Sequence, residues 1–103
     1  MARVIVTPSA DADTAEIIAH LAAKAGYRVA DKYNASFEQL YDMLADFPDS
    51  GAPRPKVGAH IRIGIVSPYI AIYRHTEAED TVRVLRIVHG SRRITGKLLR
   101  GTS

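Results

Sequence analysis

The chain has 103 residues, of which 47% are hydrophobic and 24% are charged, and its formal net charge is +3. These proportions exclude an intrinsically disordered or fibrous chain, and the length predicts one domain over residues 1–103. The absence of cysteine excludes disulfide bonds, thiolate zinc sites and a cysteine nucleophile.

The N-terminal half predicts a short strand followed by a helix. Residues 3–7 are rich in β-branched side chains, and they are followed by Pro8, which cannot continue a strand ladder. Ser9 is suited to cap a helix that runs to Ala25, and Gly26 ends it. Small and apolar residues at helical spacing predict the buried stripe, namely Ala15, Ile18, Leu21, Ala22 and Ala25.

The strongest periodic signal in the sequence predicts a second helix, from about residues 27–29 to Pro48. Its apolar positions recur every three or four residues and are Ala30, Tyr33, Phe37, Leu40, Tyr41, Leu44 and Phe47. Pro48 ends the helix because the residue before a proline is disfavoured in the helical region. The join around Gly26 is so short that the two helices must form an antiparallel hairpin.

The remaining sequence predicts a loop, three strands and a tail. Residues 49–58, DSGAPRPKVG, are rich in proline and glycine and are expected to form the loop. The strands are expected at about 60–66, 69–75 and 81–89, with short turns at 67–68 and 76–80. Such short turns force antiparallel pairing. The basic tail, residues 91–103, is expected to be either a short helix or an extended arm.

This order of elements predicts an α+β fold in which an N-terminal strand precedes an antiparallel helical hairpin packed on an antiparallel sheet. The longest apolar run, residues 64–73, is interrupted by Ser67 and Pro68, so no membrane span is expected. No signal peptide is recognised either. The sequence therefore predicts a cytoplasmic protein.

Charge is distributed unevenly along the chain. Acidic side chains outnumber basic ones over residues 1–53, whereas basic side chains predominate over residues 54–103. One explanation is a surface that meets a polyanion or an acidic protein. The other is that these are solvated charges that keep a small domain in solution, and the sequence leaves both open.

Metal and cofactor chemistry is not expected. The histidines are His20, His60, His75 and His89. They lack the spacing of paired metal ligands, and no cysteine is present to complete a tetrahedral zinc site. The sequence also lacks a phosphate-binding loop and the nucleophile elbow of serine hydrolases.

One group of basic residues is suited to a ribonuclease that needs no metal. Its members are Arg62, Arg74, Arg86 and His89. Arginine forks hold phosphates, and a histidine exchanges protons near neutral pH. The alternative is that these arginines, together with Arg83, Arg92 and Arg93, are exposed on the strands or pair with Glu77, Glu79 and Asp80.

Four motifs, in this order and spacing, resemble the ParE/RelE toxin superfamily of type II toxin–antitoxin systems from Val4 to about Leu99. They are Thr7-Pro8-Ser9-Ala10-x-Ala12-Asp13, Phe47-Pro48-Asp49-Ser50-Gly51-x-Pro53-Arg54-Pro55, Tyr69-Ile70-Ala71-Ile72-Tyr73-Arg74 and Val84-Leu85-Arg86-Ile87-Val88-His89-Gly90-Ser91-Arg92-Arg93.

The superfamily contains two activities. RelE-like members cut messenger RNA on the ribosome with lysine and arginine clusters and a late tyrosine or histidine, whereas ParE-like members poison DNA gyrase. Lys56 is the only lysine between Lys32 and Lys97, and no tyrosine follows Tyr73. The resemblance is therefore closer to the ParE, or plasmid stabilisation, branch and implies a gyrase-inhibiting toxin that is not an enzyme. His89 keeps the ribosome-dependent endonuclease open as the alternative. A third hypothesis is an inactive family member that only binds its antitoxin.

The resemblance also implies a partner, a ParD-like antitoxin that forms a hetero-oligomer with the toxin. We expect gyrase to be contacted by His89, Arg92, Arg93 and Lys97. We expect the carboxylates of the antitoxin to be bound by Arg62, Arg74 and Arg83. No cofactor, metal or membrane is implied.

Overall fold

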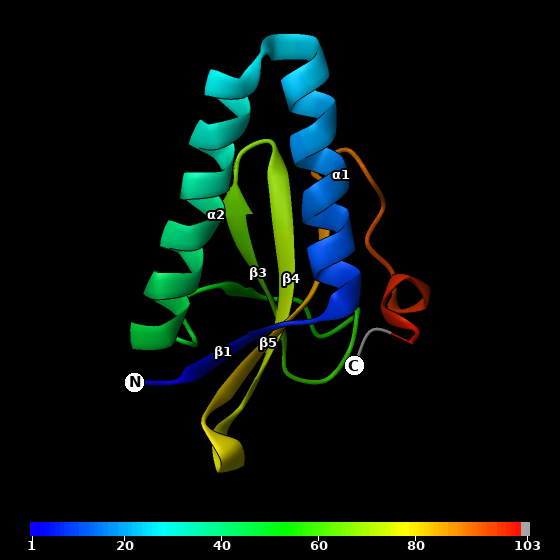
Figure 1. Ribbon diagram of the computed structural model, residues 1–103. Helices are drawn as coiled ribbons and strands as arrows, with labels where there is room; N and C mark the ends of the chain where they lie inside the picture. The colour runs from blue at the N-terminus through cyan, green and yellow to red at the C-terminus, as the bar shows by residue number, and fades with distance from the viewer. Residues whose placement is uncertain (102–103) are drawn as a thin grey trace.

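The computed structural model describes residues 1–101 and has two layers, a helical hairpin and a five-stranded sheet (Figure 1). The helices are α1 (Pro8–Ala25) and α2 (Tyr27–Asp46). The strands are β1 (Arg3–Val6), β2 (Ala52–Pro53), β3 (Ile61–Val66), β4 (Tyr69–Thr76) and β5 (Thr81–His89). Short 3-10 helices, η1 (Glu77–Glu79) and η2 (Gly96–Leu99), lie between β4 and β5 and after β5. The predicted α+β class is confirmed, while residues 102–103 of the predicted tail lie outside the described residues.

Helix α1 begins at Pro8 and is capped by Thr7. The Thr7 hydroxyl accepts a hydrogen bond from the backbone nitrogen of Ala10 (3.2 Å) and donates one to the backbone oxygen of Leu85 (3.1 Å). Pro8 is favourable in the first turn because the N–H that it lacks would have no helical partner there. The prediction that Ser9 caps the helix is therefore wrong. The pairing of β1 with β5 ends at Val6, so Thr7 is the residue between the strand and the helix and is in the position of the cap.

The buried face of α1 is rotated from the predicted stripe. Ala10 is fully buried, and Ile17 and Leu21 pack half-buried against the core. Ala15 and Ala25 are exposed, so their assignment to the stripe is wrong. Alanine has too little apolar area to set the rotation of a helix, and the larger side chains decide it.

Helix α2 buries the face that its periodicity predicts. The buried residues are Ala30, Phe37, Leu40 and Leu44. Phe47, however, is exposed, which makes its assignment to this face wrong. The helix ends at Asp46, and Phe47 has a ψ of 70°, so its side chain no longer follows the helical period.

The strand order in the sheet is β1-β5-β4-β3-β2. The predicted antiparallel pairings of β3 with β4 and of β4 with β5 are confirmed. The complete sheet is mixed, because β1 pairs with β5 in parallel. Strand β2 is an addition to the prediction: within the expected loop 49–58, Ala52 and Pro53 pair with Ile63 and Arg62.

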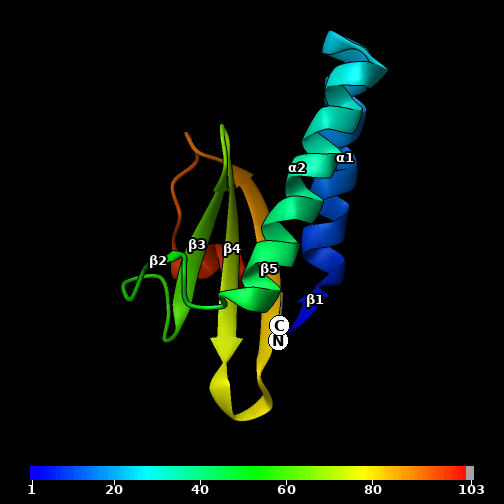
Figure 2. The same cartoon turned by 90° about the vertical axis from the view of Figure 1, so that its left-hand side faces the viewer.

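Both faces of the sheet are covered, but by different segments. The helices pack on one face over a core that includes Phe37, Leu44, Tyr73 and Val84. On the other face a smaller core of Ile61, Ile63, Ile72, Leu85 and Val88 is covered in part by Ile94, Leu98 and Leu99. Figure 2 shows the helices on one side of the sheet and the orange and red segment after β5 on the other. Part of the predicted tail therefore completes the second core.

Neither helix in residues 1–101 combines the length and the apolar composition that are needed to cross a bilayer.

Candidate functional site

The residues that the sequence groups as a ribonuclease site lie in separate places on the sheet. Arg74 is opposite Arg83 in the β4–β5 register, whereas His89 is opposite Tyr69 at the other end of β4. About five residues of strand, roughly 17 Å, separate these two positions. The structure therefore does not bring Arg74 and His89 together.

Arg86 is held by Asp13 of α1, which the sequence places in the first family motif but does not pair with Arg86. Its Nε donates to Oδ2 of Asp13 (2.7 Å), and its Nη2 donates to Oδ1 (3.0 Å). Its Nη1 donates to the backbone oxygen of Leu98 in η2 (3.2 Å). The hydrogen bonds to Asp13 raise the pKa of Arg86 further above its ordinary value. This guanidinium thus joins α1, β5 and the C-terminal segment. Its two hydrogen bonds to the Asp13 carboxylate join groups of opposite charge, which makes them stronger than bonds between neutral groups.

Arg62 anchors the loop that follows α2. Its Nη1 donates to the backbone oxygens of Asp49 (2.9 Å) and Gly51 (2.8 Å), and its Nε lies 3.6 Å from Oδ1 of Asp49. The backbone nitrogen of Gly51 donates to the hydroxyl of Tyr73 (2.9 Å). Burial raises the pKa of Tyr73, although the Gly51 hydrogen bond acts in the opposite direction. Arg62 and Tyr73 therefore hold the loop against β3 and β4.

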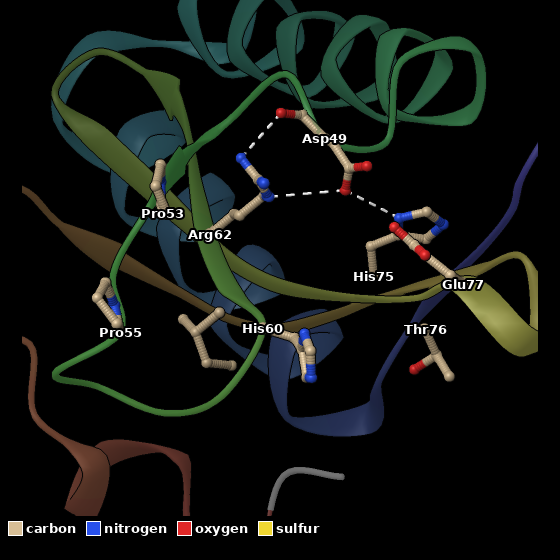
Figure 3. A pocket seen from close by; sticks show the side chains of 9 residues that line it. Asp49, Pro53, Pro55, His60, Arg62, His75, Thr76 and Glu77 are labelled. Atoms are coloured by element: carbon tan, nitrogen blue, oxygen red, sulfur yellow. Dashed lines mark hydrogen bonds and ion pairs between the residues drawn. The ribbon is translucent and has the colours of Figure 1, made fainter.

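His75 lies between two carboxylates beside this loop, as Figure 3 shows for Asp49. Only 8% of its side chain is exposed. Its Nδ1 is 2.9 Å from Oδ1 of Asp49, and its Nε2 is 3.4 Å from Oδ1 of Asp80, without an aligned hydrogen bond there. Burial by itself lowers the pKa of His75, but the two carboxylates outweigh it, so the pKa is raised above 6.5.

A cavity of about 400 Å³ opens next to His75, between the loop and the β3–β4 strands (Figure 3). Donor atoms of Asp49, His75 and Glu77 lie within 4.8 Å of one another there. This spacing suits a metal ion, but Arg62 already places a positive charge beside Asp49. We assign no metal to the group. Sequence reasoning missed the cluster because Asp49 is far from His75 along the chain.

The residues predicted to contact gyrase lie in a largely exposed segment that begins with the last residue of β5, residues 89–97, which we call the exit segment. His89, Arg92, Arg93 and Lys97 are all exposed, and within residues 1–101 none forms an ion pair with a carboxylate. The turn is fixed by Gly90, whose backbone nitrogen donates to the backbone oxygen of Pro68 (2.7 Å). A basic surface without internal partners is free to meet an acidic ligand.

The His89 ring is ordered by its neighbours within the exit segment. It packs edge-on against Tyr69, with ring centroids 5.9 Å apart. Its Nδ1 accepts a hydrogen bond from the backbone nitrogen of Ser91 (3.0 Å). In the neutral ring the proton is therefore on Nε2.

The three arginines predicted to bind the antitoxin are divided between the two faces of the sheet. Arg74 and Arg83 are cross-strand partners on the face away from the helices. Arg62 lies on the helix side, beside its partner Tyr73. Arg83 also contacts Glu79, at 3.2 Å, so the predicted pairing with the acidic turn is found for this arginine.

A comparison with protein families matches residues 4–94 to the model described as the ParE toxin of the type II toxin–antitoxin system, parDE. A comparison with curated proteins finds no match.

Two solved structures illustrate the likeness in fold. A chain described as the chromosomal ParDE TA system from P. aeruginosa has a TM-score of 0.72 and 24% sequence identity, over 86% of this chain and 96% of that chain. A chain of the toxin–antitoxin complex RelBE2 from Mycobacterium tuberculosis has a TM-score of 0.62 and 22% identity, over 85% of this chain and 96% of the other. At these identities the likeness establishes the fold alone.

Proposed function

Because this chain belongs to the family of ParE toxins of type II toxin–antitoxin systems, we propose that it inhibits DNA gyrase in the cytoplasm. The observation that carries this proposal is the family match over residues 4–94. It is supported by the exit segment, in which His89, Arg92, Arg93 and Lys97 are exposed and lack acidic partners within residues 1–101. These four residues would contact gyrase. The toxin would act by binding and not as an enzyme.

The geometry favours gyrase over messenger RNA as the target. Metal-free cleavage of RNA needs cationic groups and a proton-transferring group around one phosphate. Arg74 and His89 lie at opposite ends of β4, and Arg86 is engaged by Asp13 and Leu98. The ribonuclease alternative would require these residues to rearrange.

We further propose that a ParD-like antitoxin neutralises the protein in a hetero-oligomer. The two structural relatives are described as toxin–antitoxin systems or complexes. Arg74 and Arg83 form an arginine pair on the face away from the helices, suited to antitoxin carboxylates. Arg62 would contribute on the other face, although the loop already uses its guanidinium.

The gyrase proposal is tested with purified protein in a supercoiling assay, together with a search for stabilised DNA-cleavage complexes. The double variant Arg92→Glu/Arg93→Glu should raise the inhibitory concentration by about tenfold or more, because charge reversal repels an acidic target surface. The matched control is Lys24→Glu/Arg28→Glu, which makes the same charge change at exposed sites near the tip of the helical hairpin. Cleavage of ribosome-bound messenger RNA without any effect on gyrase would overturn the proposal.

A further inference from the structure

A groove between α1 and β5 opens beside the exit segment, and we name it the α1–β5 groove. It has a volume of about 540 Å³. Its apolar lining includes Ile17 and Leu21 of α1, which are half-buried, and Ile87 of β5, which is 2% exposed. Polar side chains of α1 and of the exit segment form its walls. An apolar floor with polar walls is the arrangement found where a protein binds a side chain of a partner protein.

The two walls of the α1–β5 groove carry different charges. Arg92 lies on the exit-segment wall, whereas Glu16 and His20 lie on the α1 wall. None of these three forms an ion pair within residues 1–101. Asp13 also lines the groove, but its carboxylate is engaged by Arg86. One carboxylate on the α1 wall and one guanidinium on the exit-segment wall therefore remain for a ligand.

The exit-segment wall is held in place by short contacts. A Cβ at Gly90 would lie 3.0 Å from the backbone oxygen of Pro68, so this turn packs directly on the turn between β3 and β4. The backbone nitrogen of Arg92 donates to the backbone oxygen of His89 (2.9 Å), and the His89 ring packs on the buried Tyr69. A wall that is ordered before binding loses little conformational entropy when a partner binds.

These features suit a protein segment better than a nucleic acid. A nucleic acid presents phosphates, which Glu16 would repel and which the apolar floor would not bind. An apolar side chain with an acidic neighbour fits both parts of the groove, because the acid can pair with Arg92. The groove is also continuous with the exit segment, the surface proposed to contact gyrase.

We propose that a segment of gyrase inserts an apolar side chain into the α1–β5 groove and places an acidic side chain beside Arg92. The inference rests on the proposed function and extends its contact surface from the exit segment to Ile17, His20 and Leu21 of α1. The buried apolar side chain supplies most of the affinity, and the charges around it select the partner.

The first test is inhibition of gyrase supercoiling by the full chain. His20→Glu should raise the inhibitory concentration by about fivefold or more, because the new charge repels the acidic segment. His20→Gln adds no charge and should raise it less. Ala15→Glu is the matched control, since it adds a glutamate at an exposed position of α1 that does not line the groove. Urea denaturation should give the wild-type midpoint for both glutamate variants.

Methyl NMR of the wild-type toxin tests the apolar anchor without a variant. With the isoleucine, leucine and valine methyl groups labelled, the signals of Ile17 and Leu21 should shift when gyrase is added. The signal of Val29 in α2, which lies outside the groove, should shift less. The same shifts at Ile17 and Leu21 with DNA alone would assign the groove to a nucleic acid and overturn the proposal.

The remaining outcomes separate this surface from the proposed function. Wild-type inhibition by His20→Glu, or an equal loss in Ala15→Glu, would overturn the α1–β5 groove while leaving gyrase as the target. Unchanged methyl signals of Ile17 and Leu21 in a saturated complex would do the same. Failure of the wild-type toxin to inhibit gyrase would overturn the proposed function and, with it, this surface.

Discussion

Strand β5 extends past the end of β1, and strand β3 extends past the end of β2, so each has an outer edge that its neighbour covers only in part. The two edges differ in what contacts the remaining backbone groups. At β5 the side chains of Thr7 and Asp13 form hydrogen bonds with backbone groups of Leu85 and Ile87 that β1 leaves unpaired, and Asp13 is itself held by Arg86. At β3, the pairing with the two-residue strand β2 ends at Ile63, and an apolar groove lies beside the residues that follow. An edge whose backbone groups are bonded to side chains resists pairing with another chain, whereas an edge with unpaired backbone groups does not. The comparison shows that side chains cover the backbone at one edge, whereas part of the other edge has no strand partner within residues 1–101.

The largest effect is expected from removing the cap on β5. Asp13→Ala leaves Arg86 and the Ile87 N–H without their partner, and the side chains of Asp13 and Arg86 are only 15% and 21% exposed. Breaking such a pair should lower the free energy of unfolding by about 3 kcal/mol. Urea denaturation measures this loss. Glu16→Ala, an exposed acid on the same helix, is the control and should change stability by less than about 0.5 kcal/mol.

The Asp13 prediction has a second check in a double-mutant cycle. Adding Arg86→Ala to Asp13→Ala should cost much less than Arg86→Ala costs alone, because the pair is already broken. Additive losses would mean that the two residues do not act as a pair and that Asp13 is not the cap of this edge.

A smaller effect is expected at β3, where Gly64 lets α2 approach the strand. Gly64→Ala should destabilise the protein by about 1 kcal/mol, since the new methyl group would lie 2.9 Å from Leu40, whose side chain can shift in part. Thermal or urea unfolding provides the measurement. Shortening the neighbour in Leu40→Ala/Gly64→Ala should remove the added cost of the alanine at position 64. If the cost persists, the contact with Leu40 is not its cause.

The smallest effect is expected from the pH dependence of the loop beside β3. The folded pKa of His75 is raised above 6.5, so its contribution is fully present below pH 6.5 and is lost as pH rises through the folded pKa. The groups around it are Asp49, Asp80, Glu77 and, through Asp49, Arg62. Asp49 and Asp80 are more than half exposed, which weakens the interaction by solvent screening.

Hydrogen exchange at pH 6 and pH 9, corrected for the intrinsic rates, distinguishes the two edges in this experiment. Protection of the β2 segment should fall at pH 9 in the wild type, and this change should be absent in His75→Gln. Protection at Ile87 should not change, since Arg86 keeps its charge at both pH values. Equal loss of protection at both edges would contradict the assignment of His75 to the β3 side.

The sequence predicted the candidate site unevenly. The basic residues of the exit segment are exposed, and they are close together because they are local in the chain, at and just after the end of β5. Arg62, Arg74 and Arg86, which the sequence grouped, lie in different surroundings because strand side chains alternate between the two faces and because Asp13 holds Arg86 at the sheet edge. Asp13 itself carries a weak sequence signal, an acidic residue in the second turn of a helix.

The sequence alone determined the α+β class, the helical hairpin, the antiparallel β3–β4–β5 meander and the family resemblance. Each depends on periodicity, on turn residues or on short linear motifs, which neighbouring residues set. Only the tertiary structure decided that β1 pairs in parallel with β5, that Thr7 instead of Ser9 caps α1, and that the exit segment continues into a cover for the second core. The same holds for the contrast between the two sheet edges. These features join residues that are far apart in the chain, and the free energy that selects them comes from packing and hydrogen bonds that exist only after the chain has folded.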